Sequence, residues 1–323
     1  MPLTLADFAR LSTDPVKRGV VMTWQMESFL MDKLPWEAAG TLHIEVIRMK
    51  KAPVPTWRKL NASFTEDKAT AEPIQEQVFD IGGNCDVDYQ LVHATNQIVN
   101  PRSFQTEAYS KAIAYAVNDV LVNGDPTVNE DALIGLKYRI MALLPAAQHI
   151  NLAGLDVSAD SAGLSANEDT LLDALNSIVW RLDGHKGSCI VTNDTLFLRL
   201  QSALRKKGLL AQDKDQFGRI IWSYLGMPII DLGFTTPDGT TKVITDVEPT
   251  DGSLYGSAAG STSLYVLRTG GQYLNGFYQY PMRVEDLGLI DSGVHYRTLI
   301  EWPIGIYMVN PRSVARLSGI VAA

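Results

Sequence analysis

The chain has 323 residues, of which 46% are hydrophobic and 20% are charged, so it can build one large core or two linked ones. Its net charge of -8 argues against a broad cationic face that grips nucleic-acid phosphates. The two cysteines lack CxxC spacing, which excludes a disulfide framework and favours folding in a reducing cytoplasm. Neither a basic-then-apolar leader nor a run of about 20 apolar residues occurs, so we expect no secretory signal and no membrane span.

Two helices are predicted in the N-terminal segment. The first covers residues 3–11, and the second starts at Thr13-Asp14-Pro15 and runs to about Leu34. Apolar residues cover too much of the second helix for one narrow stripe, so another surface must cover them. We predict that a neighbouring copy of the chain does so. The residues predicted to make this contact are Trp24, Phe29 and Leu30.

A long β-hairpin is predicted next. Strand-like alternation begins at Thr41, is interrupted by two prolines and resumes over residues 56–60. A polar tip over residues 61–73 leads into a returning strand over residues 74–81. A hairpin with so little core of its own is marginal in water, so we expect it to dock on a partner.

The outgoing arm of this hairpin carries a cluster of basic residues with no acid between them. The cluster consists of Arg48, Lys50, Lys51, Arg58 and Lys59. One interpretation is a solvated face, which is usual for such runs. A second is electrostatic docking on an acidic surface of an adjacent copy, with Trp57 as an apolar anchor. Nucleic-acid binding is a third interpretation, disfavoured because only one aromatic residue lies among the charges.

The remaining pattern mixes helices and strands without a βαβ rhythm, which indicates an α+β fold. Helices are predicted over residues 104–123, 171–182 and 194–207, and loops over residues 151–166 and 249–263. Strands are predicted over residues 189–191, 264–268, 274–284, 294–302 and 304–309, with strand and turn over residues 220–230 and 236–241.

The residue types that carry catalysis are not arranged for it. The five histidines have no metal-ligand spacing, no GxSxG elbow occurs, and the acids between residues 156 and 169 do not match a calcium loop. Asp80, Asp86 and Asp88 alternate along a strand, which favours a solvent-facing polar face over a catalytic pair. The run 184–188 lacks phosphate-loop spacing and is interpreted as a turn. We therefore predict no enzyme activity, no cofactor and no metal.

Five segments in order resemble the major capsid proteins of tailed phages with the Hong Kong 97-type fold. They are the N-terminal segment, the hairpin, the helix 104–123 followed by "NGD" and "GL", the stretch from "CIVTNDTLFLRLQSALRKKG" to "GRIIWSYLGMPIID", and the final strands from "SLYVLRTGG" to "ARLSG". Each motif is short, but their order and spacing together are much more specific.

The resemblance implies a division of the chain. Residues 1–39 are expected to form an N-arm and residues 40–80 an extended loop, the E-loop. Residues 81–149 and 263–299 would form a peripheral domain with a long spine helix, and residues 150–262 and 300–323 an axial domain.

The resemblance also implies a function and partners. A homo-oligomer of hexamers and pentamers would form an icosahedral shell around double-stranded DNA, bound without sequence specificity and away from any membrane. The protein would belong to the virion capsid and assemble in the host cytoplasm. No delta domain of about a hundred residues precedes the arm, so a separate scaffolding protein and a portal are expected.

Covalent cross-linking and two alternative functions are also considered. Lysines occur in the hairpin and Asn275 in a late strand, but no flanking pattern marks a reactive pair, so a covalent Lys–Asn cross-link is not expected. An encapsulin-like shell around an enzyme cargo is the alternative function. An α+β hydrolase is a more distant one.

Overall fold

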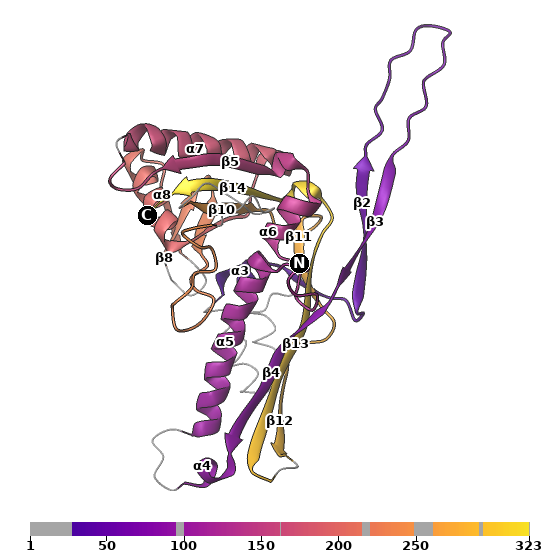
Figure 1. Ribbon diagram of the computed structural model, residues 1–323. Coiled ribbons are helices and arrows are strands. Elements are labelled where there is room, and N and C mark those ends of the chain that lie inside the picture. The colour runs from indigo at the N-terminus through magenta and orange to yellow at the C-terminus, as the bar shows by residue number, and fades with distance from the viewer. Residues whose placement is uncertain are drawn as a thin grey trace.

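The computed structural model describes residues 28–94, 100–161, 163–214, 220–248, 261–290 and 293–322. Two sheets form the body, and a long hairpin projects away from it (Figure 1). The helix predicted over residues 3–11, and most of the one predicted to start at residue 13, lie outside the described residues. Within them, α3 (Phe29–Lys33) ends just before Leu34, where the second helix was predicted to end.

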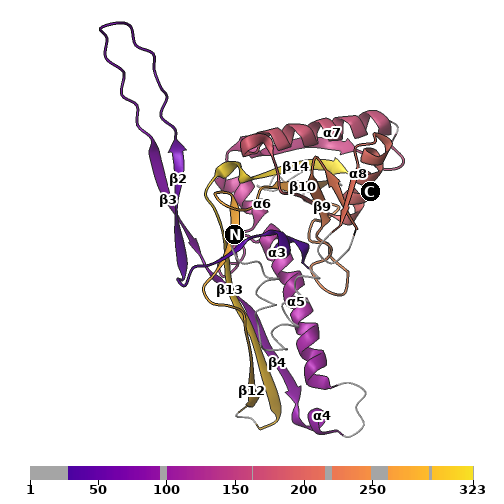
Figure 2. The same cartoon turned by 180° about the vertical axis from the view of Figure 1, so that it is seen from behind.

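A five-stranded sheet and one long helix form the elongated part of the body. Strand β13 (His295–Met308) is central, with β4 (Phe79–Asp88) along one side and β11 (Leu274–Tyr278) and β12 (Arg283–Leu289) in succession along the other. Short β1 (Trp36–Ala38) adds to β11 in parallel. Helix α5 (Pro101–Asn123) runs alongside β4, and α4 (Tyr89–His93) lies at the far end (Figure 2).

Pro303 lies in the middle of β13 and yet does not end it. Pairing with β12 ends at Glu301, pairing with β11 begins at Ile304, and β4 continues across both. The N–H that proline lacks therefore falls at the gap between two partner strands, where the ladder loses little. The two strands predicted over residues 294–302 and 304–309 are accordingly one.

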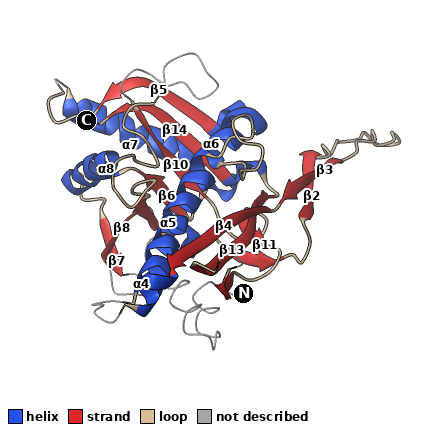
Figure 3. Cartoon of the chain, turned by 60° about the horizontal axis from the view of Figure 1, so that its bottom comes forward, coloured by secondary structure: helices blue, strands red, loops and turns tan. Residues whose placement is uncertain are grey.

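A seven-stranded sheet forms the second part of the body. Its order is β5 (His149–Asp156), β14 (Val314–Val321), β10 (Thr262–Leu267), β6 (Cys189–Thr192), β9 (Met227–Asp231), β8 (Ile220–Tyr224) and β7 (Ala211–Lys214). Helix α7 (Leu164–Arg181) packs on β5 and β14, and α8 (Asp194–Lys206) packs near β9 (Figure 3). Short α6 (Leu136–Tyr138) and a π-helical turn (Arg139–Leu143) connect α5 to this sheet.

Local capping signals explain where the long helices begin and end. The Asn100 side chain accepts from the Arg102 N–H and Pro101 occupies the first turn, so α5 begins three residues before the predicted Phe104. The Asn193 side chain accepts from the Leu196 N–H at 3.0 Å and caps α8. Gly208, at φ +69°, follows α8 in the left-handed conformation that glycine favours.

Several predicted elements were wrong. The loop predicted over residues 151–166 contains most of β5, and residues 236–241 contain no strand, only a turn closed by a bridge between Phe234 and Lys242. The strand predicted over residues 274–284 is broken between β11 and β12. The residue pattern alone did not predict strand β14.

The sheets also divide the chain differently from the predicted domain boundaries. Strand β10 was assigned to the peripheral domain but pairs with β14 and β6 in the seven-stranded sheet. Residues 300–308 were assigned to the axial domain but complete β13 in the five-stranded sheet. The predicted domain boundary at residue 300 therefore falls inside the continuous strand β13.

Candidate assembly surfaces

The hairpin of β2 (His43–Lys51) and β3 (Thr70–Gln77) is attached to the body only at its root. There Val46 packs with Phe277 and Tyr307 in a small separate core. Beyond the Lys51–Thr70 pair, residues 52–69 contain no strand, so the predicted strand over residues 56–60 is not formed. The root is thus part of the folded body, whereas the outer half is not.

The outer half of the hairpin exposes large apolar side chains. Trp57 is fully exposed and Leu60 is 91% exposed. The other large apolar residues exposed on the hairpin are Leu42, Ile47, Met49, Val54 and Phe64. Single exposed apolar residues are ordinary, but a group of them on a projecting hairpin indicates an interaction surface.

The basic cluster of the hairpin is balanced by acids on both arms. Lys51 pairs with Asp67 across the hairpin, and Arg58 lies over the Phe64 ring at 5.3 Å. Lys59 is exposed, and of Lys50 only the backbone is described. Residues 40–80 carry six basic and six acidic residues, so the hairpin is neutral as a whole. The six acids are Glu45, Glu66, Asp67, Glu72, Glu76 and Asp80. A neutral hairpin favours docking through apolar contacts over docking through charge alone.

Arg48 is committed to its own subunit. Its Nη2 donates to the Met308 carbonyl of β13 at 3.0 Å. Burial lowers the pKa of Arg48, the nearby Glu76 carboxylate raises it, and the Arg139 cation lowers it. Arg48 therefore holds the root of the hairpin against its own subunit. We no longer predict that it contacts a neighbouring copy.

A buried ion pair also fastens the root. Arg139, in the π-helical turn, donates from Nη1 and Nη2 to the two carboxylate oxygens of Glu76 on β3, at 2.5 and 2.7 Å. Both side chains are under 10% exposed. Sequence patterns did not single out this pair. The available signal was that Glu76 shares the inward face of β3 with Ile74, where a charge needs a buried partner.

The described end of the N-terminal segment packs in its own subunit. Leu30 is 2% exposed and lies in the main core with Met31, Leu34 and Trp36. The Ser28 hydroxyl donates to the Asn118 side chain near the C-terminal end of α5. Leu30 is thus internal. Trp24 lies outside the described residues, as does the side chain of Phe29.

The "NGD" and "GL" motifs hold the end of α5 against the turn that follows it. The Gly135 N–H donates to the Gly124 carbonyl at 2.8 Å. A Cβ on Gly135 would lie 2.5 Å from the Gly124 nitrogen, and one on Gly124 would lie 2.0 Å from the Leu133 carbonyl oxygen. Both φ values are ordinary, so glycine is needed here for backbone contact.

A second buried charge network links α6 to the seven-stranded sheet. Arg316 of β14 is fully buried, and its Nη2 donates to both carboxylate oxygens of Glu248 at 2.8 Å. Ser263 donates to the same carboxylate, and Lys137 of α6 lies 3.4 Å from it. Burial, and then the Arg316 cation, lower the pKa of nearby His149 to about 4.

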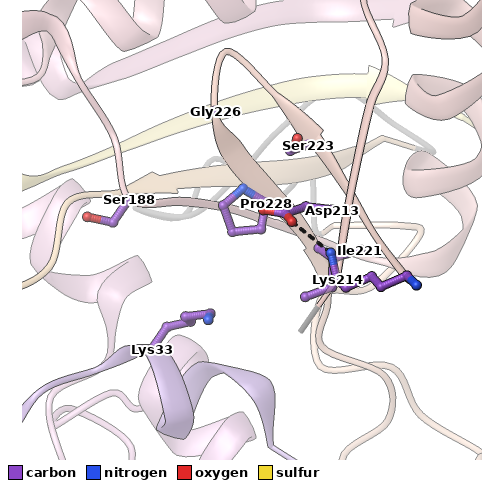
Figure 4. Close-up of a pocket in the computed structure, with 8 residues that line it drawn as sticks. All are labelled: Lys33, Ser188, Asp213, Lys214, Ile221, Ser223, Gly226 and Pro228. Carbon is purple, nitrogen blue, oxygen red and sulfur yellow. Dashed lines mark hydrogen bonds between the residues drawn. The ribbon is translucent and has the colours of Figure 1, made fainter. Parts of the chain in front are cut away.

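Two cavities in the described part of the chain contain no catalytic arrangement. In Figure 4, Lys33 of α3 lies across a cavity of about 320 Å³ from Asp213 and Lys214 on the edge strand β7 and from Pro228 on β9. The dashed line there is the Lys214 N–H donating to the Asp213 carboxylate at 2.8 Å. The other cavity, between α5 and the sheet, has largely apolar walls. No group of three metal-ligating side chains occurs among the described residues.

Three sequence expectations can be placed on the structure. Residues 184–188 form a turn that leads into β6, and a Cβ on Gly187 would lie 2.6 Å from the Met227 sulfur, so that glycine serves packing. Asn275 is fully buried, and its amide donates to the Gly271 carbonyl at 2.8 Å. Asp86 pairs with Arg297 on the exposed side of β4. Among the described helices, none has the length and apolar content to cross a membrane.

Comparisons with known proteins agree with this architecture. Residues 20–154 match the family model of the major capsid protein GP7. No curated protein sequence matches the chain. The match covers the hairpin, α5, the glycine motifs and the Arg139 turn.

Solved structures of an encapsulin and of two phages are similar to this fold. An encapsulin of Synechococcus elongatus PCC 7942 matches with a TM-score of 0.60 and 14% identity, over 99% of this chain and 96% of the encapsulin. The structure of Mycobacterium phage Ogopogo matches with a TM-score of 0.58 and 14% identity, over 90% and 92%. The capsid of Myoviridae phage XM1 matches with a TM-score of 0.55 and 14% identity, over 90% and 91%.

At this identity the solved structures establish the fold, and the family match covers residues 20–154, which is less than half of the chain. The chain itself has a body of two sheets, a long helix and a projecting hairpin. The chain has the Hong Kong 97-type fold, and its residues 20–154 are similar to the major capsid protein GP7 family.

Proposed function

We propose that this chain self-assembles into hexamers and pentamers of an icosahedral shell that encloses phage double-stranded DNA. The observation that carries the proposal is the outer half of the hairpin, where Trp57 and Leu60 project into solvent beyond any core of their own subunit. In a shell, such side chains enter pockets on a neighbouring copy and contribute most of the contact energy. The role is structural, without catalysis or a cofactor.

The negative net charge supports a shell into which DNA is packaged from outside. At -8, the subunit has no global cationic field that would hold DNA against its surface. DNA would be enclosed without sequence-specific contacts. We further propose a separate scaffolding protein and a portal as partners, assembly in the host cytoplasm and a final place in the virion capsid.

The experiment compares Trp57→Ala with the unchanged chain. Because Trp57 is fully exposed in the subunit, its removal should leave the melting temperature unchanged. We expect the concentration needed for shell formation to rise by roughly 30-fold, the effect of about 2 kcal/mol for a hot-spot residue. Light scattering measures this concentration, and Val128→Ala, at an exposed site off the hairpin, is the control. Shell formation at the normal concentration would remove Trp57 from the contact.

The basic residues of the tip are tested separately. Arg58→Glu together with Lys59→Glu should leave the subunit folded, since Lys59 is exposed and Arg58 contacts only the tip. If the tip meets an acidic surface, shells seen by electron microscopy should become rare. Normal shells would restrict the contact to the apolar side chains.

A second candidate function is an encapsulin-like compartment around an enzyme cargo. It is favoured by the match to the Synechococcus encapsulin along almost the whole of both chains. The family match over residues 20–154 favours the phage shell. Neighbouring genes for a portal and a terminase would support the phage shell, whereas a peroxidase or ferritin-like neighbour would support the compartment.

A further inference from the structure

One guanidinium group joins the root of the hairpin to the body. Arg139 uses three nitrogens there: Nε donates to the Ile134 carbonyl at 2.9 Å, and Nη1 and Nη2 hold the Glu76 carboxylate. Nη2 also lies 3.2 Å from the Ile306 carbonyl of β13. One planar group therefore joins the hairpin, the turn after α5 and the central strand.

The form of this contact fixes an angle as well as a distance. Two parallel hydrogen bonds between a guanidinium and a carboxylate require the two planes to align. Strand β3 carries the carboxylate, so its direction is tied to that plane. Arg48 holds the other strand at the Met308 carbonyl, two residues along β13 from Ile306. Both strands of the hairpin are thus held against the C-terminal end of β13.

Small rotations at the root become large movements at the tip. From Glu76 to Asn61 the chain spans at most about 50 Å at 3.3 Å per residue. A rotation of about 10° at the root then moves the tip by up to about 9 Å, which is larger than a side-chain pocket. An exposed tip finds its contact on a neighbour only if the root holds its direction.

We propose that Arg139 is a positioning residue for shell assembly, which acts by holding Glu76 and thereby the direction of the hairpin. This inference rests on the proposed function for its role in assembly. The geometric part, that the pair limits the movement of the hairpin, concerns the subunit alone. The two parts can therefore fail separately.

Stability alone is a weak reason for this pair. Replacing a buried ion pair by apolar residues of similar size is often neutral or stabilising, whereas removing one partner leaves an uncompensated charge. The double variant Glu76→Leu with Arg139→Met therefore separates the two roles. It should keep the melting temperature within about 5 °C while it loses the directional contact.

The test measures the distance from the hairpin tip to the body by pulsed electron paramagnetic resonance. Spin labels are attached to Ser63→Cys at the tip and Asp173→Cys on α7, both exposed sites in the full-length unassembled chain. The native Cys85 and Cys189 are buried and escape labelling. The unchanged pair should give a narrow distance distribution, and the double variant one at least twice as wide. Without labels, the double variant should need at least a tenfold higher concentration to form shells.

Two further variants make the outcome specific. Arg139→Lys keeps the charge but loses the bidentate contact, so its distance distribution should be intermediate, and it serves also if the double variant does not fold. Lys51→Ala breaks an exposed pair beyond the root and should leave the distance distribution unchanged. Distributions in the folded Arg139 variants as narrow as the original would overturn the proposal. An unchanged chain that forms no shell would overturn only the proposed function.

Discussion

Gly124 and Gly135 are the residues whose chemical identity the fold restricts most clearly. Their backbones touch, and a methyl group on either would collide with main-chain atoms that cannot move aside. Because the contact holds the end of α5 against the Arg139 turn, it also supports the surface from which the hairpin is held. The "NGD" and "GL" motifs that pointed to the family thus have a physical reason.

We expect Gly135→Ala to lower the free energy of unfolding by about 2 to 3 kcal/mol, in the range of overpacked sites. Chemical denaturation followed by circular dichroism measures this. Gly163→Ala is the control, since its nearest neighbour atom would lie 3.9 Å from the new Cβ. The control should cost under about 1 kcal/mol, the effect of a poorer helix cap. Equal losses in the two variants would refute the steric account.

His149 makes the stability of the subunit depend on pH. Its pKa is about 4 in the folded chain and 6.5 ordinarily, so the unfolded chain takes up a proton first as the pH falls. The contribution of His149 is complete above pH 6.5 and is lost between pH 6.5 and 4. Since solvent reaches part of the ring, we expect a loss of about 1 to 2 kcal/mol.

The variant His149→Gln removes the titration but can still bond to Ser318, whose hydroxyl lies 2.7 Å from His149 Nε2. Urea titrations at pH 7 and pH 4.5 should show a smaller difference for this variant than for the unchanged chain. The same pH dependence in both would assign the effect to other groups.

At the scale of elements, the sequence predicted what local chemistry determines. Helices α5 and α8 follow from Asn100, Asn193 and Gly208, and strand β6 from three apolar residues after a turn. The hairpin was predicted too, and its Trp57 is exposed as expected of a contact residue. The contact itself stays a prediction.

The missed elements depend on distant partners. Strand β5 pairs in parallel with β14, more than 150 residues later, and both are irregular at the same place. There Ala153, Gly154 and Gly319 have positive φ, which by itself is typical of a loop. The Arg139–Glu76 pair likewise joins residues 63 apart, so no local pattern could reveal it.

Two truncations separate contact from core in the N-terminal segment. Deleting residues 1–27 leaves Leu30, Met31 and Trp36 in place, so the subunit should keep its melting temperature while shell formation is blocked or misdirected. Deleting residues 1–36 removes these buried side chains and should destabilise the subunit by several kcal/mol. Thermal melts and electron micrographs of both chains check this. Wild-type shells from the shorter deletion would rule out a contact role for residues 1–27.

At the scale of the whole molecule, the shape suits a subunit whose exposed hairpin becomes buried in an assembly. Two cores are closed within the chain, whereas the outer hairpin has an apolar surface with no cover among the described residues of its own subunit. Shell subunits bury far more area against neighbours than a standard interface of about 1,600 Å². A hairpin fixed at its root and exposed at its end is one way to reach that area.

The central claim is that this chain builds a closed shell, and imaging the purified chain by cryo-electron microscopy tests it most directly. We predict closed icosahedral particles in which the hairpin of each subunit lies on a neighbour, with Trp57 buried in the contact. A stable monomer at all concentrations, or particles in which Trp57 remains in solvent, would contradict the account.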